Sequence, residues 1–127
     1  MPRDPAEHPE DDRIRLTHML DYSRKAVRFC SGRTASDFEQ DEVLLLAVLK
    51  AVETIGEAST KVSERTRARL PGIDWWVVRR MRNRIIHGYD TINTTIVWDT
   101  VRLAVPPLIE ELERALAEWP GDSPPVA

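Results

Sequence analysis

The apolar residues of the C-terminal third recur at steps of three and four, namely at Val97, Val101, Val105, Leu108, Leu112 and Leu116. Residues with this spacing share one face of an α-helix. The segments 12–29 and 41–62 show the same period, and no segment shows the alternation of two that is typical of a strand. We therefore predict an all-α fold, an antiparallel four-helix bundle with one or two short extra helices.

Residues with known preferences for helix ends mark several boundaries. Gly32 is expected to end the first helix, and "ASDFEQ" is interpreted as a short turn. The helix from about Asp41 to Val62 is apolar all round in its first half, which predicts the most buried helix of the bundle. A short basic helix is expected to start at Ser63.

The second half of the chain carries similar signals. Asp74 is a candidate N-cap for a helix over residues 75–87, and Asn93 is a candidate N-cap for the last helix. Pro106 and Pro107 lack backbone donors, so we expect them to kink that last helix or to split it.

The length of 127 residues suits one domain with a real core. Residues 1–11 and 120–127 are rich in proline and acidic residues, and we expect both tails to be mobile around a domain at 12–119. No signal peptide is recognisable, and the run Val43–Leu49 is too short to span a membrane. The single cysteine, Cys30, fits a reducing cytoplasm, and we interpret it as a small buried residue.

The charge is unevenly distributed, although the chain as a whole carries −3. Residues 61–87 hold eight Lys and Arg against two acids, and the remainder holds ten against nineteen. A basic segment in an acidic protein is compatible with a patch that binds phosphates. A solvated helical face is the alternative that the charge alone leaves open.

The stretch "RNRIIHGY" at residues 82–89 holds the most chemistry. An arginine such as Arg82 presents a charged fork that suits a phosphodiester. His87, at a helix C-terminus, could take a proton from a 2′-hydroxyl or give one to a leaving oxygen. Such a pair could cleave RNA by internal attack without a metal or cofactor. Supporting contacts could come from Asn83 and, for flanking phosphates, from Arg79, Arg80 and Arg84.

These eight residues alone do not distinguish an active site from an ordinary helix end. The histidines, at positions 8, 18 and 87, do not cluster in sequence, so a metal site is not predicted.

Glu53 and Glu57 share a helix face, with Gly56 beside them. Gly56 indicates close approach of another helix, and one of the glutamates is hypothesised to pair with Arg79 or Arg82. Exposure to solvent, with Glu57 paired to Lys61, is the alternative.

The stretch "MRNRIIHGYDTI" resembles the signature of HepT-like proteins, a branch of the HEPN ribonuclease toxins, whose motif is Arg-x4-6-His extended to His-x-Tyr. Arg82, His87 and Tyr89 match the three motif positions. Three further stretches are similar to the same family: "HMLDYSRKAVRF", "AVETIGEAS" with "VSERTRARLPGIDWW", and "IVWDTVRLAVPPLIEELE". The resemblance covers roughly residues 14–116.

The resemblance implies a metal-independent endoribonuclease toxin of a type VII-like toxin–antitoxin module. It implies a homodimer whose two motifs face one composite cleft. It also implies an MNT-type nucleotidyltransferase antitoxin as partner, which neutralises the toxin by transferring AMP to Tyr89. A non-catalytic subunit that binds nucleotide or the nucleotidyltransferase is the alternative function, and a purely structural oligomer is a third.

Overall fold

The computed structural model describes residues 9–86 and 92–119, with side chains for 10–82 and 92–119, and every regular element in these ranges is helical. This confirms the all-α prediction. The elements are α1 (Pro9–Cys30), α2 (Asp37–Gln40), α3 (Glu42–Thr60), α4 (Glu64–Arg69), α5 (Trp75–Ile86), α6 (Thr94–Asp99), the π-helical turn η3 (Thr100–Ala104) and α7 (Val105–Ala117).

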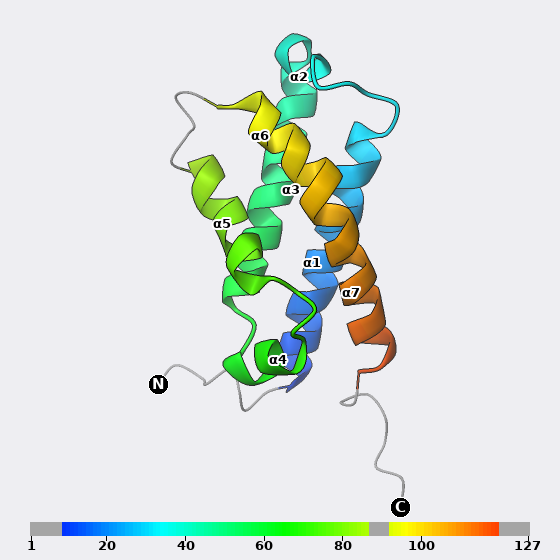
Figure 1. Cartoon of the computed structure of the whole chain (residues 1–127), viewed down its shortest axis with the longest axis vertical. Coiled ribbons are helices and arrows are strands. Elements are labelled where there is room, and N and C mark those ends of the chain that lie inside the picture. The colour runs from blue at the N-terminus through cyan, green and yellow to red at the C-terminus, as the bar shows by residue number, and fades with distance from the viewer. Residues whose placement is uncertain (1–8, 87–91, 120–127) are drawn as a thin grey trace, which may run out of the picture.

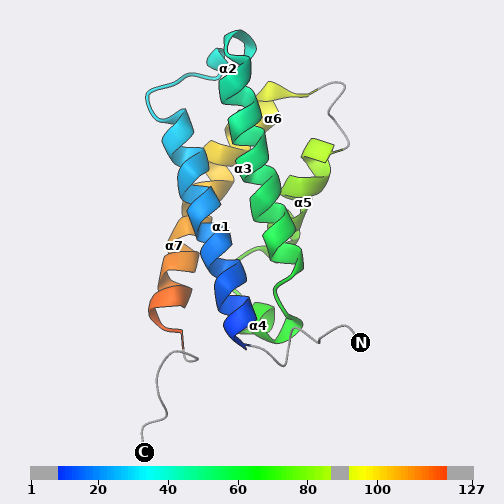
Figure 2. The same ribbon diagram turned by 180° about the vertical axis from the view of Figure 1, so that it is seen from behind.

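The long elements form an antiparallel bundle in which α1, α3, α5 and the run α6–η3–α7 alternate in direction (Figure 1). α3 packs between α1 and α5, and α1 also packs on α7. Figure 2 shows the same arrangement from behind, with α3 between α1 and α5. The short helices α2 and α4 lie at opposite ends of the bundle. No helix within the described ranges is both long and apolar enough to cross a membrane.

The predicted caps Asp74 and Asn93 are present, and Asp41 and Ser63, the predicted starts of their helices, are caps as well. The side chains of Asp41, Ser63 and Asn93 each accept a hydrogen bond from the backbone N–H three residues later. Asp74 does the same for Val77 at a distance of 3.2 Å. Gly32, just after α1, has a φ of 74°, a backbone conformation that favours glycine.

The last helix is irregular immediately before its two prolines, as predicted. η3 forms there, and Val105 donates its backbone N–H to Thr100, five residues earlier. Pro106 and Pro107 cannot donate to the carbonyls one turn before them, and their rings would clash with those carbonyls in a regular α-helix. The wider π turn is a known accommodation for such a disruption.

The N-terminus of α1 lies earlier than expected, at Pro9, and Asp12 is therefore a residue of the first turn, where it is buried. Its carboxylate accepts hydrogen bonds from the Ser63 backbone N–H (3.0 Å), the Ser63 hydroxyl (2.6 Å) and the Thr66 hydroxyl (2.5 Å). All three residues are at least 94% buried. This network joins the start of α1 to the start of α4.

One sequence-based prediction is wrong. "ASDFEQ" contains the helical turn α2, because Phe38 is buried and its ring meets Trp98 edge-on at 5.6 Å between centroids. The prediction that α3 is the most buried helix is confirmed, since it packs between α1 and α5, although Val43 is 78% and Leu46 54% exposed in its first half. Among the described residues, no other element covers these two side chains on the outer face of α3.

Candidate active site at the end of α5

α5 presents two different faces. Val78 and Met81 are buried and belong to the core, whereas Arg79 and Arg80 are exposed. Arg82 lies at the border between the two faces, with 40% of its side chain exposed. The amphipathic pattern of α5 therefore directs the basic residues outward and leaves Arg82 beside α3.

Gly56 of α3 allows α5 to approach closely at Arg82, as the sequence predicted from a glycine inside a helix. A Cβ added at Gly56 would lie only 2.7 Å from both the Cβ and the backbone nitrogen of Arg82. The obstructing atoms belong mainly to the backbone, so the helix itself would have to move. The position of Arg82 relative to α3 thus depends on the absence of a side chain at residue 56.

Glu57, the next residue of α3, forms an ion pair with Arg82. The distance between Glu57 Oε2 and Arg82 Nε is 2.8 Å, and the two side chains are 46% and 40% exposed. The pairing of one glutamate with an arginine of the adjacent helix was one of the two possibilities raised by the sequence. The structure therefore selects Glu57, and it pairs across helices rather than with Lys61.

Other predicted site residues are placed less completely. Glu53 is half-buried and lies one turn from Glu57, toward the level at which α5 ends; it forms no hydrogen bond or ion pair with another described side chain. The backbone of Asn83 and Arg84 belongs to the last turn of α5, and their side chains lie outside the described residues. His87 and Tyr89 also lie outside the described residues, directly after the helix.

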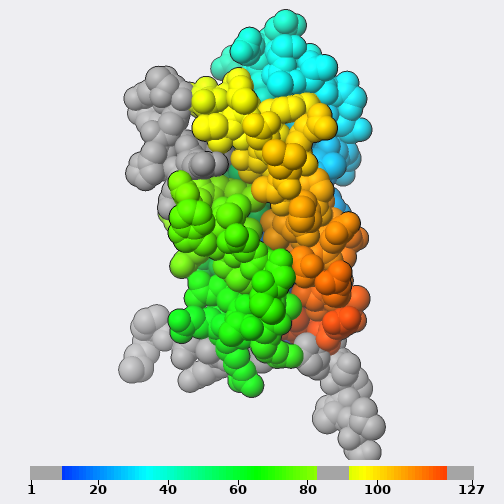
Figure 3. All heavy atoms as spheres, viewed as in Figure 1, coloured from blue at the N-terminus to red at the C-terminus, as the bar shows by residue number. Residues whose placement is uncertain are grey.

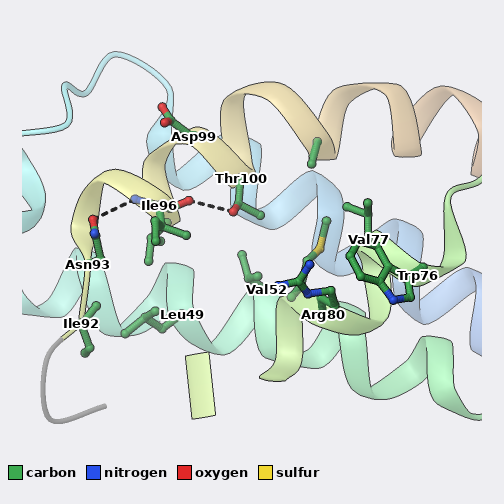
Figure 4. Close-up of a pocket in the computed structure, with 13 residues that line it drawn as sticks. Leu49, Val52, Trp76, Val77, Arg80, Ile92, Asn93, Ile96, Asp99 and Thr100 are labelled. Carbon is green, nitrogen blue, oxygen red and sulfur yellow. Dashed lines mark hydrogen bonds between the residues drawn. The ribbon is translucent and has the colours of Figure 1, made fainter. Parts of the chain in front are cut away.

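Sequence reasoning missed a groove between α5 and the α6–η3 segment. Its volume is about 540 Å³, and its walls come from α3, α5, α6 and η3 (Figure 4).

The two tryptophans at the start of α5 have different surroundings. Trp75 is partly buried and donates its indole N–H to the Leu70 carbonyl, whereas Trp76 lines the groove and is 64% exposed.

The chemistry of the remaining side chains is limited. Among residues 10–82 and 92–119, no three His, Cys, Asp or Glu side chains lie together in a way that could hold a metal ion. Cys30 is buried in α1, as expected, and this burial raises the pKa of its thiol. A protonated, inaccessible thiol is a poor nucleophile, so Cys30 contributes packing.

The family described as Ribonuclease HepT-like matches residues 19–115, which include most of the helical bundle and Arg82. The chain belongs to this family. No solved structure matches the chain.

Curated relatives of this HepT-like chain are also described as ribonucleases. A protein of Methanocaldococcus jannaschii described as "Putative RNase" is 31% identical over 113 residues, which cover 89% of this chain and 93% of the relative. A "Probable ribonuclease HepT" of Thermococcus cleftensis is 35% identical over 78 residues, covering 61% and 71%. A "Putative RNase" of Caldanaerobacter subterraneus is 29% identical over 101 residues, covering 80% and 90%.

Proposed function

We propose that the chain is a metal-independent endoribonuclease whose active site is built on Arg82 and His87. Membership of the HepT-like ribonuclease family supports the reaction class. The observation that carries the site is the double restraint on Arg82 by neighbouring residues of α3. Gly56 admits its backbone, and Glu57 pairs with its side chain. A guanidinium held in one place, yet 40% exposed, can meet a phosphate without a large loss of side-chain entropy.

In the proposed reaction, the 2′-oxygen of one nucleotide attacks the adjacent phosphorus, and the bond from phosphorus to the 5′-oxygen breaks. The products are a 2′,3′-cyclic phosphate and a 5′-hydroxyl. The 2′-hydroxyl loses a proton and the leaving oxygen gains one, and His87 serves one of these two transfers. Arg82 stabilises the charge that builds on the phosphate oxygens.

Glu57 acts through Arg82, as a positioning residue. The ion pair engages Nε of the arginine, and this limits the rotation of the guanidinium. Exposed Arg79 and Arg80, together with Arg84, are proposed to contact flanking phosphates, and such contacts carry no base specificity. Asn83 and Glu53 are proposed to support the pair at the end of α5.

A homodimer with a composite cleft is proposed as the active form. Val43 and Leu46 lie on the same face of α3 as Glu53 and Glu57, because these positions are separated by helical steps. Both apolar side chains are more than half exposed. A second copy covering this face would bury them and would approach Arg82, which lies beside Glu57.

Regulation is proposed to follow the pattern of a type VII-like toxin–antitoxin module. An MNT-type nucleotidyltransferase would transfer AMP to the hydroxyl of Tyr89, two residues after His87. The added phosphate charge and adenine bulk would then occupy the position of an RNA substrate. This part of the proposal is supported by the match of Tyr89 to the motif.

The test is RNA cleavage by the purified protein in EDTA, after mass spectrometry has confirmed that Tyr89 is unmodified. We expect products with a 2′,3′-cyclic phosphate. His87→Ala should reduce the rate by about 10²- to 10⁴-fold, the usual contribution of a general acid or base. His18→Ala is the matched control, because His18 is exposed on α1 and remote in sequence from the motif.

Cleavage that persists in His87→Ala would contradict the assigned mechanism. Cleavage that disappears in EDTA and returns with a divalent cation would contradict metal independence. If folded protein with unmodified Tyr89 cuts no RNA, the non-catalytic partner-binding subunit becomes the better interpretation.

A further inference from the structure

The groove between α5 and the α6–η3 segment has an apolar floor and a rim that differs on its two sides. Leu49 and Val52 of α3 form part of the floor, together with Met81 of α5 and Val97 of α6. A volume of about 540 Å³ falls in the range of pockets that bind small molecules or parts of larger ones. In Figure 3 the segments on its two sides, α5 and α6–η3, lie on the same face of the molecule.

The α5 rim offers an aromatic ring and a cation. Trp76 is 64% exposed, and the Arg80 guanidinium carbon lies 4.3 Å from the centre of its ring. The cation covers one face of the indole and restrains it, while the large exposed fraction leaves indole surface for another planar group. Exposed tryptophans beside arginines are typical stacking platforms for the bases of single-stranded nucleic acids.

The α6 rim offers fixed polar groups. The Asn93 side-chain oxygen accepts the Ile96 backbone N–H at 3.2 Å, and the Thr100 hydroxyl donates to the Ile96 carbonyl at 2.7 Å (Figure 4). These bonds orient both side chains, and they leave the Asn93 amino group as a donor and the Thr100 oxygen as an acceptor. Asp99 on the same side repels phosphate, so a bound nucleotide would direct its phosphate toward Arg80.

The groove also lies close to the candidate active site along the chain. Ile92 lines the groove and follows His87 by five positions in the sequence. Arg80 precedes Arg82 by two residues, so the two are about 3 Å apart along the axis of α5 but about 200° apart around it, on opposite sides of the helix. A strand with one base in the groove would therefore reach the arginine that is proposed to bind the scissile phosphate by crossing the exposed face of α5, where Arg79 lies between them.

We propose that this groove is a base-binding subsite, which accepts one unpaired base of the RNA near the cleaved bond by stacking on Trp76 while Arg80 holds its phosphate. The proposal rests on the ribonuclease function for the identity of the ligand. A second copy of the chain is a less suitable occupant, because an apolar helix face would desolvate Arg80 and Asp99 without giving either a partner.

The test measures binding of a short, fluorescently labelled 2′-O-methyl RNA strand to the wild-type protein, since such a strand cannot attack its own phosphates. A strand of the same length with abasic residues is measured beside it. Trp76→Ala should weaken binding of the strand with bases by about 5- to 150-fold and leave the abasic strand nearly unaffected. Trp76→Phe should restore part of the affinity.

Two further variants separate stacking from charge. Leu103→Ala is the matched control, because Leu103 is an exposed apolar residue of η3 that does not line the groove, and it should leave binding unchanged. Arg80→Gln should weaken binding of both strands and make its salt dependence shallower by roughly one phosphate contact. Trp76→Ala should leave the salt dependence unchanged.

Equal weakening of both strands by Trp76→Ala would overturn the proposal, as would absence of binding by the wild type. A Trp76→Ala protein that loses self-association and binds RNA normally would assign the groove to a second copy. If the wild type binds with this base dependence but cuts no unmodified RNA, the subsite stands and the ribonuclease proposal fails.

Discussion

Around α1 the bundle is closed, with α3 on one side and α7 on the other, whereas α5 packs on α3 and faces a groove toward α6 and η3. The buried polar network of Asp12 also lies on the α1 side. The α5 side carries an exposed tryptophan, exposed arginines and a glycine where another side chain would fit poorly. This difference supports the proposal that α5 serves recognition and chemistry, whereas α1 contributes mainly to stability.

The largest expected effect on stability concerns the α1 side. Asp12→Ala would leave three donors of Ser63 and Thr66 without their acceptor in a buried position. We expect the free energy of unfolding to fall by about 2–4 kcal/mol, measured by urea denaturation. Asp21→Ala, at an exposed position of the same helix, should change it by less than about 0.5 kcal/mol. Similar losses in the two variants would contradict the role assigned to the buried network.

An intermediate effect is expected where α5 meets α3. Gly56→Ala would place a methyl group against the Arg82 backbone, and we expect it to lower the free energy of unfolding by about 1–3 kcal/mol despite the better helix propensity of alanine. The displaced Arg82 should also reduce RNA cleavage.

Gly72→Ala provides the control for this substitution. Its added Cβ would meet the end of the Glu111 side chain, which can move away. We expect a clearly smaller change in stability and normal cleavage. A Gly56→Ala protein with unchanged stability and cleavage would show that the contact with Arg82 is not a tight one.

The smallest effect on stability is expected for the ion pairs that join different helices. The effect on activity should differ between these pairs. Glu57→Gln and Glu113→Gln each weaken a 2.8 Å pair with an arginine, and all four side chains are about half exposed. Each should cost at most about 1 kcal/mol. Only Glu57→Gln should slow RNA cleavage, by about tenfold, because only its partner is proposed to act on the phosphate.

The kinetic pattern of Glu57→Gln decides between positioning and binding. We expect kcat to fall more than KM rises, since the guanidinium keeps its charge and loses its orientation. Equal rates for Glu57→Gln and the wild type, with equal stability, would remove Glu57 from the active site.

The sequence by itself determined the helical class, most helix ends and the irregular last helix. These features depend on local chemistry: the period of the apolar residues, the capping side chains of Asp74 and Asn93, and the missing donors of two prolines. Gly56 also signalled a close helix contact, because a glycine inside a helix carries a local cost that a neighbour can explain.

Only the tertiary structure decided which residues meet across helices. It selected Glu57 over Glu53 as the partner of Arg82, and it placed Asp12 in a buried network although an acidic residue near a terminus is ordinarily exposed. It also buried Phe38 and exposed Trp76, two aromatic residues with little local signal to separate them. Burial and pairing depend on neighbours that are distant along the chain, and the period of a single helix does not encode those neighbours.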